Sequence, residues 1–141
     1  IMTVFLDTNV MLDFLGEREP FFEIAESIIN QADKGKLTIF VSALSFATCN
    51  YFLSKKFGDA ISKGKIIKFK ILSEIVALDE MIIDKSILST FSDFEDGLQY
   101  FSALKANCQY IVTRNEKDFK KAEIPVFSPS DFLEFYLNNK P

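Results

Sequence analysis

Residues 3–9 read TVFLDTN, and residues 109–115 read QYIVTRN. In each stretch a short apolar run, of the kind that forms buried strands, stops at polar residues. The first run ends at Asp7 and the second at Thr113. Because ligands bind beyond the carboxyl ends of the strands in open parallel sheets, we expect these polar residues to line a functional site.

The remaining sequence alternates short β-rich runs with longer helical ones. Apolar runs predict further strands at 37–41, 75–78 and, as a short edge strand, 125–127. Helical spacing of apolar residues, with cap and stop signals, predicts helices at 22–34, 43–56, 58–72, 84–90, from Ser92 to about 104 and from Ser130 onward. We therefore expect a single domain over residues 1–141, an α/β fold built as a three-layer α/β/α sandwich with a central, mainly parallel sheet of four to five strands.

The composition excludes several kinds of chemistry. The chain has no histidine, which excludes Ser-His-Asp and Cys-His nucleophile systems and zinc sites with imidazole ligands. Cys49 and Cys108 are far apart and outside any CxxC pair, which indicates free thiols in a reducing cytoplasm. No apolar run approaches the ~20 residues of a membrane span, and the first residues lack the features of a secretory signal. We expect a cytoplasmic protein that does not insert into membranes.

Three acids that are remote in sequence are predicted to meet at one edge of the sheet. Asp7 follows the first strand, Asp118 lies one helical turn after the strand at 109–112, and Asp96 lies in the first turn of the helix before it. Each acid alone is better explained as a helix cap or as a favourable charge at a helix start. Together they repel one another unless a cation neutralises them. Oxygen ligands without His or Cys favour Mg²⁺ or Mn²⁺, which activate water for phosphodiester hydrolysis.

The net charge of −4 does not by itself indicate a nucleic-acid partner. The basic residues nevertheless cluster, with six lysines within residues 55–70 and a second group that includes Arg114 and Lys117. Solvated helix faces explain both groups slightly better than a phosphate-binding rim does. Arg114 and Lys117 lie beside the predicted site, and we name them as candidate substrate-binding residues.

The chain resembles the PIN domains, metal-dependent ribonucleases that include the toxins of many bacterial toxin–antitoxin pairs. The resemblance rests on FLDTNVMLDFL at 5–15 and on DFEDGLQYFSALKANCQYIVTRNEKDF at 93–119, which ends in a TRNxxDF-like block. The resemblance extends over nearly the whole chain. The two blocks in this order are specific to the family, whereas the DTN motif alone would be weak evidence for it. The resemblance implies an RNA substrate, an Mg²⁺ or Mn²⁺ cofactor, an antitoxin partner and a homodimer.

The resemblance also assigns roles to individual residues. Asp7, Asp96 and Asp118 would be the metal ligands and catalytic acids. Thr113 would orient the site through hydrogen bonds, and Asn9 would steady the loop around Asp7. The other supporting residues would be Asn115, near the site, and Glu95, either an outer acid or a solvated cap.

One departure from the family pattern affects the predicted activity. PIN domains usually carry a Glu on the helix after the second strand, in a stretch similar to SALSFATCNYFL at 42–53. The best match for that Glu is Thr48, and the stretch contains no acid. Because the loss of a carboxylate weakens metal binding, we keep two hypotheses. One is a ribonuclease toxin, and the other is a catalytically weak or inactive PIN-fold module that binds RNA or protein.

A third alternative is an α/β domain of the phosphatase or receiver type, with Asp7 as an aspartyl nucleophile. A phosphatase of that type needs a second acid where Asn9 stands, and a receiver needs a Lys where the late strand runs into Thr113 and Arg114. The sequence fits both poorly. For an interface with a second copy or an antitoxin, we expect exposed apolar helix residues such as Phe21, Phe22, Phe132, Phe135 and Tyr136.

Overall fold

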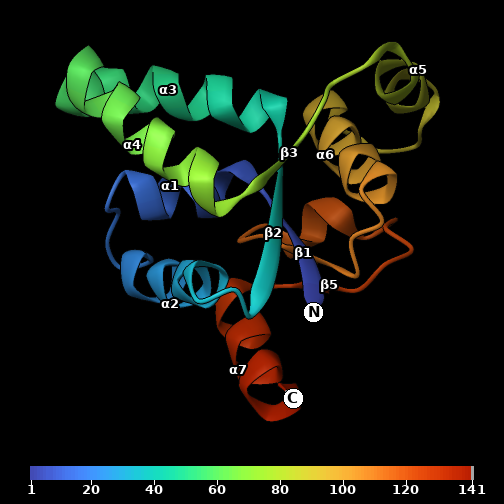
Figure 1. The fold of residues 1–141 in the computed structure, drawn as a ribbon. Helices are drawn as coiled ribbons and strands as arrows, with labels where there is room; N and C mark the ends of the chain where they lie inside the picture. The colour runs from blue at the N-terminus through green and yellow to red at the C-terminus, as the bar shows by residue number, and fades with distance from the viewer. Residues whose placement is uncertain (141) are drawn as a thin grey trace.

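A computed structural model of the chain describes residues 1–140, in which five parallel strands form one sheet (Figure 1). The strands are β1 (Met2–Leu6), β2 (Leu37–Ser42), β3 (Glu74–Val76), β4 (Tyr110–Val112) and β5 (Val126–Phe127). They pair in the order β3-β2-β1-β4-β5, and every pair is parallel. The predicted α/β fold with a sheet of four to five strands is confirmed, and the sheet is parallel throughout.

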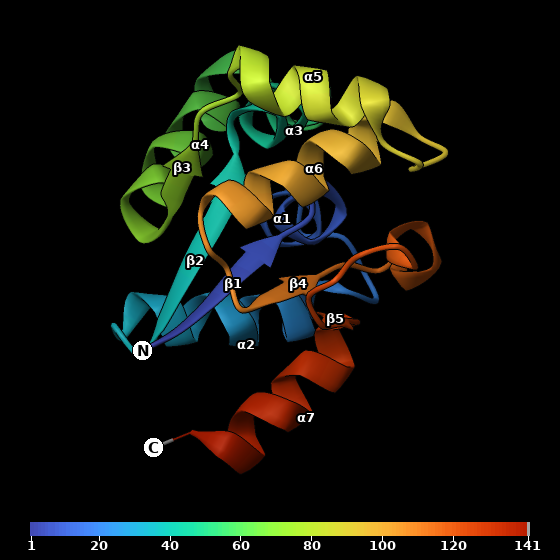
Figure 2. The ribbon, with the colours of Figure 1, turned by 90° about the vertical axis from the view of Figure 1, so that its right-hand side faces the viewer.

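Helices cover both faces of this sheet. Within the described residues they are α1 (Thr8–Leu15), α2 (Phe22–Asp33), α3 (Ala43–Phe57), α4 (Asp59–Leu72), α5 (Glu80–Leu88), α6 (Phe94–Lys105), α7 (Pro129–Asn139) and the 3-10 helix η1 (Glu116–Phe119). Successive side chains of a strand point to opposite faces. Accordingly, Val4 and Leu6 pack in the core with α1 to α4 and α7, whereas Phe5 packs in a second core with α5 and α6. Figure 2 shows α6 lying across the strands on this second face.

Several helix boundaries differ from those expected. α6 begins at Phe94 and is capped by the Asp93 side chain, not by Ser92, because the Asp93 carboxylate accepts the Glu95 backbone N–H at 3.0 Å. The Asp79 carboxylate caps α5 in the same way and starts it before the predicted residue 84. The cap of α7 is Ser128, not Ser130, because proline suits the first position of a helix and Pro129 occupies it. Helix α1, which begins at Thr8 within the first quoted stretch, was not predicted.

The chain order places one crevice at the centre of the sheet. From β1 the chain builds one half of the sheet through β2 and β3, and it then crosses to the other side of β1 to form β4 and β5. The carboxyl ends of β1 and β4 therefore lie side by side, with Leu6 paired to Val112 and the Asp7 N–H donating to the Val112 carbonyl at 3.0 Å. Such a change of direction is where open α/β sheets bind ligands.

The apolar surface is only partly where the sequence analysis expected it: Phe21 is 38% exposed, whereas Phe22 and Phe135 are half-buried. Phe132 and Tyr136 are core residues, only 1% and 2% exposed, because α7 packs them against the sheet and α2. The more exposed large apolar side chains on the helices lie mainly on α3, α4 and α5: Tyr51, Phe52, Ile61, Ile67, Ile71, Met81, Ile87 and Leu88. None of the described helices has the length and apolar character needed to cross a membrane.

Candidate active site

The three predicted acids line one cavity. Asp7, Asp96 and Asp118 all border a cavity of about 410 Å³ beyond the carboxyl ends of β1 and β4. Of the other predicted residues, five border the same cavity: Asn9, Thr48, Glu95, Arg114 and Asn115. Thr113 is fully buried and reaches the site only through hydrogen bonds. Lys117 is exposed on η1 and does not line the cavity, so the structure does not bring this predicted residue into the site.

Asp7 is held by donors from three parts of the chain. Its Oδ2 accepts the Thr113 hydroxyl at 2.8 Å and, more weakly, the Asn9 amide at 3.5 Å. Its Oδ1 accepts the Thr8 backbone N–H at 2.9 Å and the Gln99 amide at 3.1 Å. The first of these two bonds caps α1, so the capping role considered from the sequence is present as well. Because four donors fix it, the Asp7 carboxylate has a defined orientation.

Gln99, on α6, is a site residue that the sequence analysis missed. Its side-chain amide also donates to the Thr8 and Ser45 hydroxyls, both at 3.1 Å, and its carbonyl oxygen accepts the Ser42 hydroxyl at 2.5 Å. These bonds join α6 to β2, α1 and α3 beneath the cavity. The available signal was its position three residues after Asp96, which places both side chains on one helix face.

The cavity concentrates negative charge around Asp96. Burial, followed by the neighbouring carboxylates of Asp93, Asp118, Asp7 and Glu95, raises the pKa of Asp96 to about 7. A carboxyl group in this position gains a proton near neutral pH because its ionised form is poorly solvated and repelled. A bound cation would reverse both effects, since it favours the ionised form.

The loop after β4 connects the acids to the sheet. The Asn115 N–H donates to the Thr113 hydroxyl at 3.0 Å, and the Asn115 carbonyl accepts the Asp118 N–H at 3.0 Å where η1 begins. The Arg114 N–H donates to the Asn9 side chain at 3.3 Å. These local bonds turn the chain so that Asp118 returns to the same cavity as Asp7.

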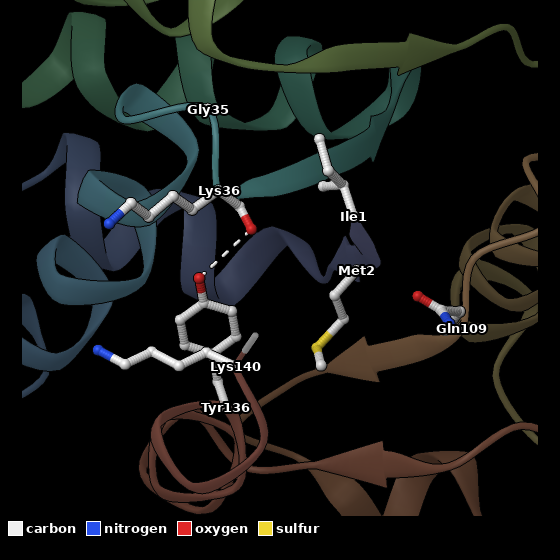
Figure 3. Close-up of a pocket in the computed structure, with 7 residues that line it drawn as sticks. All are labelled: Ile1, Met2, Gly35, Lys36, Gln109, Tyr136 and Lys140. Atoms are coloured by element: carbon white, nitrogen blue, oxygen red, sulfur yellow. Dashed lines mark hydrogen bonds between the residues drawn. The ribbon is translucent and has the colours of Figure 1, made fainter.

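A larger cavity lies elsewhere and lacks this chemistry. It has a volume of about 660 Å³ and lies at the opposite, amino edge of the sheet, between the start of β1 and α7. Figure 3 shows its lining, in which the Tyr136 hydroxyl donates to the Lys36 carbonyl at 3.3 Å. No carboxylate side chain lines it. The size of this cavity therefore does not make it the better candidate.

Comparison with known sequences agrees with this geometry. The profile of the PIN domain family matches residues 3–117, most of the chain. The chain belongs to the PIN domain family. This assignment decides against the phosphatase and receiver alternatives, and Asn9, which a phosphatase would replace with an acid, donates to Asp7 instead. No curated protein matches the sequence.

Solved structures show the same PIN fold. FitAcB from Neisseria gonorrhoeae superposes with a TM-score of 0.67 and 17% identity, over 90% of this chain and 98% of that chain. A toxin–antitoxin complex from Klebsiella pneumoniae gives 0.63 and 20%, over 89% and 97%. VapC20 from Mycobacterium tuberculosis, a sarcin–ricin loop cleaving toxin, gives 0.61 and 11%, over 77% and 86%. At these identities the similarity shows a shared fold.

The carboxylate oxygens at the cavity of this PIN domain are ligands that suit a hard divalent cation, although they do not yet converge on one ion position. The charged residues at the cavity are carboxylates and arginines, and carboxylate oxygens are the ligands that Mg²⁺ and Mn²⁺ prefer. Among residues 1–140, however, no three Asp, Glu, Cys or His side chains converge on one ion position. Side-chain rotation is needed before Asp7, Asp96 and Asp118 could share an ion. Thr48, the residue that the sequence analysis matched to the family's Glu, lines the same cavity.

Proposed function

We propose that this PIN domain is a metal-dependent endoribonuclease, the toxin component of a toxin–antitoxin pair. The observation that carries the proposal is the meeting of Asp7, Asp96 and Asp118, from three distant segments, around one cavity at the strand ends. Membership of the PIN family supports nuclease chemistry, and the predicted resemblance supports RNA as the substrate.

Asp7, Asp96 and Asp118 would hold Mg²⁺ or Mn²⁺. The bound cation would supply a water of lowered pKa and neutralise charge on the phosphoryl oxygens. Asp7 is already oriented by its four donors, so Asp96 and Asp118 are the side chains that would rotate toward it. Asp96 would then give up the proton that it holds near neutral pH.

The remaining site residues would bind and position the substrate. Arg114 borders the cavity and would bind a phosphate oxygen, while Asn115 offers a side-chain amide at the same rim. Lys117, on the solvent side of η1, would contact a flanking phosphate only if the RNA extends beyond the cavity. Glu95 would act as an outer acid that attracts cations, since it is exposed at the cavity edge.

The partners of this PIN domain are proposed from its neighbours. Several similar folds come from toxin–antitoxin complexes, which supports an antitoxin partner here. The exposed apolar side chains on α3, α4 and α5 would contact either that antitoxin or a second copy in a homodimer. The two free, buried cysteines, Cys49 and Cys108, suit a reducing cytoplasm.

Cleavage of single-stranded RNA tests the proposed activity. The purified chain should cut RNA internally with Mg²⁺ or Mn²⁺, and both EDTA and Asp7→Asn should abolish the cut, because the carboxylates act through a cation. Asp79→Asn is a matched control, since Asp79 pairs with Lys105 away from the cavity. Cleavage that survives both EDTA and Asp7→Asn would contradict the proposal.

A catalytically weak PIN module is the second candidate, and the presence of Thr48 in the cavity favours it. With a hydroxyl in place of a carboxylate, and no converged set of three acids among the described residues, metal affinity would be low. Calorimetric titration separates the candidates. RNA binding without measurable Mn²⁺ binding or turnover supports the module, whereas tight Mn²⁺ binding with robust turnover rules it out.

A further inference from the structure

A buried carboxylate beneath the cavity binds two arginines at once. Asp13, on α1, is only 1% exposed. Its Oδ1 accepts Nε of Arg18 at 2.9 Å, with Nη2 of the same guanidinium 2.8 Å away. Its Oδ2 accepts Nε of Arg114 at 2.6 Å, and Nη2 of Arg114 reaches Oδ1 at 3.2 Å. Neither the family resemblance nor the cavity acids require this arrangement.

Both arginines border the acidic cavity, whereas Asp13 does not. Further contacts limit their movement. The Arg114 guanidinium stacks over the Phe21 ring at 3.9 Å from its centroid. Nη2 of Arg18 donates to the Asn9 carbonyl at 3.3 Å, two residues from Asp7. The Nη1 groups of both arginines have no hydrogen-bond partner within residues 1–140, so each keeps donors free for a ligand.

The negative charge of the cavity explains why an RNA ligand would need the two arginines. Five carboxylates border the cavity, and alone they would repel a phosphodiester: Asp7, Asp93, Glu95, Asp96 and Asp118. One carboxylate, Asp13, shared by Arg18 and Arg114 leaves one positive charge in excess at the cavity wall. Because planar guanidinium groups match the geometry of phosphate oxygens, fixed arginines select a phosphate over a diffuse counter-ion.

We infer that Arg18 and Arg114, held in place by Asp13, form a clamp for a backbone phosphate of the RNA strand. The inference rests on the proposed ribonuclease function. It adds the residues that would allow RNA, a polyanion, to bind at an acidic site. In the clamp Arg18 and Arg114 contact the phosphate, while Asp13 is a positioning residue that acts through them. The clamp reads the sugar-phosphate backbone and not the bases, so it predicts binding with little dependence on sequence.

Equilibrium binding of RNA tests the clamp. A fluorescein-labelled single-stranded RNA is titrated in EDTA, where metal-dependent cleavage stops, at several salt concentrations. Arg18→Gln should weaken binding about tenfold and reduce the slope of log Kd against log salt by about 0.7, the value of one phosphate contact on a single strand. Arg18→Lys should restore the slope but only part of the affinity, because a lysine keeps the charge without the planar fork.

Lys105→Gln is the matched control, because it removes one positive charge from an ion pair with Asp79 outside the cavity. It should keep the wild-type slope. Equal losses in Arg18→Gln and Lys105→Gln would overturn the clamp, since net charge alone would then explain them. Wild-type binding by Arg18→Gln would overturn it as well. Thermal melting checks that each variant is folded, and if Arg18→Gln is not, a wild-type affinity in Arg18→Lys overturns the clamp.

The outcomes also separate the clamp from the proposed function. If the wild type cleaves RNA and Arg18→Gln binds and cleaves equally well, the clamp fails and the ribonuclease stands. If the wild type never cleaves but binds RNA through Arg18, the ribonuclease fails and the phosphate clamp stands. A glutamate-rich peptide that binds in an Arg18-dependent way, while RNA does not, would overturn the clamp in favour of a site for an acidic protein segment.

Discussion

The Thr113 hydroxyl donates a 2.8 Å hydrogen bond to Oδ2 of Asp7, which lies 106 residues earlier in the chain. This bond joins the residues that follow two adjacent strands, β1 and β4. The same hydroxyl accepts the Asn115 N–H at 3.0 Å. The buried Thr113 side chain therefore links the orientation of Asp7 to the loop that carries Asp118.

Thr113→Val removes this hydroxyl while keeping the shape of the side chain. Because Asp7 loses a donor and the Asn115 N–H loses an acceptor, we expect the free energy of unfolding to fall by about 1–3 kcal/mol. Metal-dependent cleavage should fall as well, since Asp7 is no longer held. Urea denaturation and single-turnover cleavage measure the two effects. Thr113→Ser retains the hydroxyl and should recover most of both, and a Val variant as stable as the wild type would contradict the expectation.

Gln99→Leu should destabilise the protein more than the same change at Gln109. Gln99 is buried and bonded to Asp7, Thr8, Ser42 and Ser45, so its loss leaves several buried polar groups unpaired, at a cost of about 2–3 kcal/mol. Gln109 is exposed at the other edge of the sheet, where its side chain accepts the Thr3 backbone N–H at 2.9 Å, so its loss should cost only about 1 kcal/mol. Urea titration compares the free energies of unfolding of the two variants. Equal losses would show that the buried hydrogen bonds of Gln99 stabilise the fold no more than those of an exposed side chain.

Thr48→Glu should increase affinity for Mn²⁺. Thr48 borders the acidic cavity, so a carboxylate there would add a ligand to the set formed by Asp7, Asp96 and Asp118. A gain of about 1.4 kcal/mol would lower the Kd for Mn²⁺ about tenfold. The control is Ala47→Glu, on the exposed side of α3 and away from the cavity. Calorimetric titration showing the same Kd in both variants would place residue 48 outside the metal site.

The raised pKa of Asp96 predicts a specific pH dependence of stability without metal. The folded protein keeps this proton up to about pH 7, whereas the unfolded chain releases it near the ordinary value of 3.8. The folded state therefore binds more protons between these values, and the contribution of Asp96 to stability falls as pH rises through this range and levels off above pH 7. The stabilisation by added Mg²⁺ should correspondingly grow from pH 6 to pH 8.

Melting temperatures measured in EDTA between pH 5 and pH 8 check this sign. Other groups titrate in the same range, so the informative quantity is the difference between the wild type and Asp96→Asn, in which the group at position 96 no longer ionises. The variant should lose the part of the slope that belongs to Asp96. Identical slopes in the two proteins would mean that this carboxyl ionises normally in the fold.

The sequence alone was sufficient to predict the α/β architecture and the edge of the sheet at which the three acids lie. Residues 3–9 and 109–115 predict buried strands that end in polar residues, and helices between the strands require a parallel sheet. Those features depend on local periodicity and on chain connectivity, which a sequence displays directly. The positions of Asp7, Asp96 and Asp118 at one edge follow from them. Helix starts were less accurate, because several polar residues near a boundary compete to cap it, as Asp93 does with Ser92.

Only the tertiary structure decided which polar side chains support those acids. Gln99 and Asp13 occupy helix positions whose spacing also fits a solvated face, and what distinguishes them is burial against partners from other segments. Arg18 lies in the turn after α1, where only its contact with Asp13 shows its role. The tertiary structure likewise decided that Lys117 is exposed on η1 and lies outside the cavity lining, while its role as a substrate contact stays a prediction. Hydrogen bonds and ion pairs between distant residues depend on how packed layers bring side chains within about 3 Å of one another, and no local pattern encodes that distance.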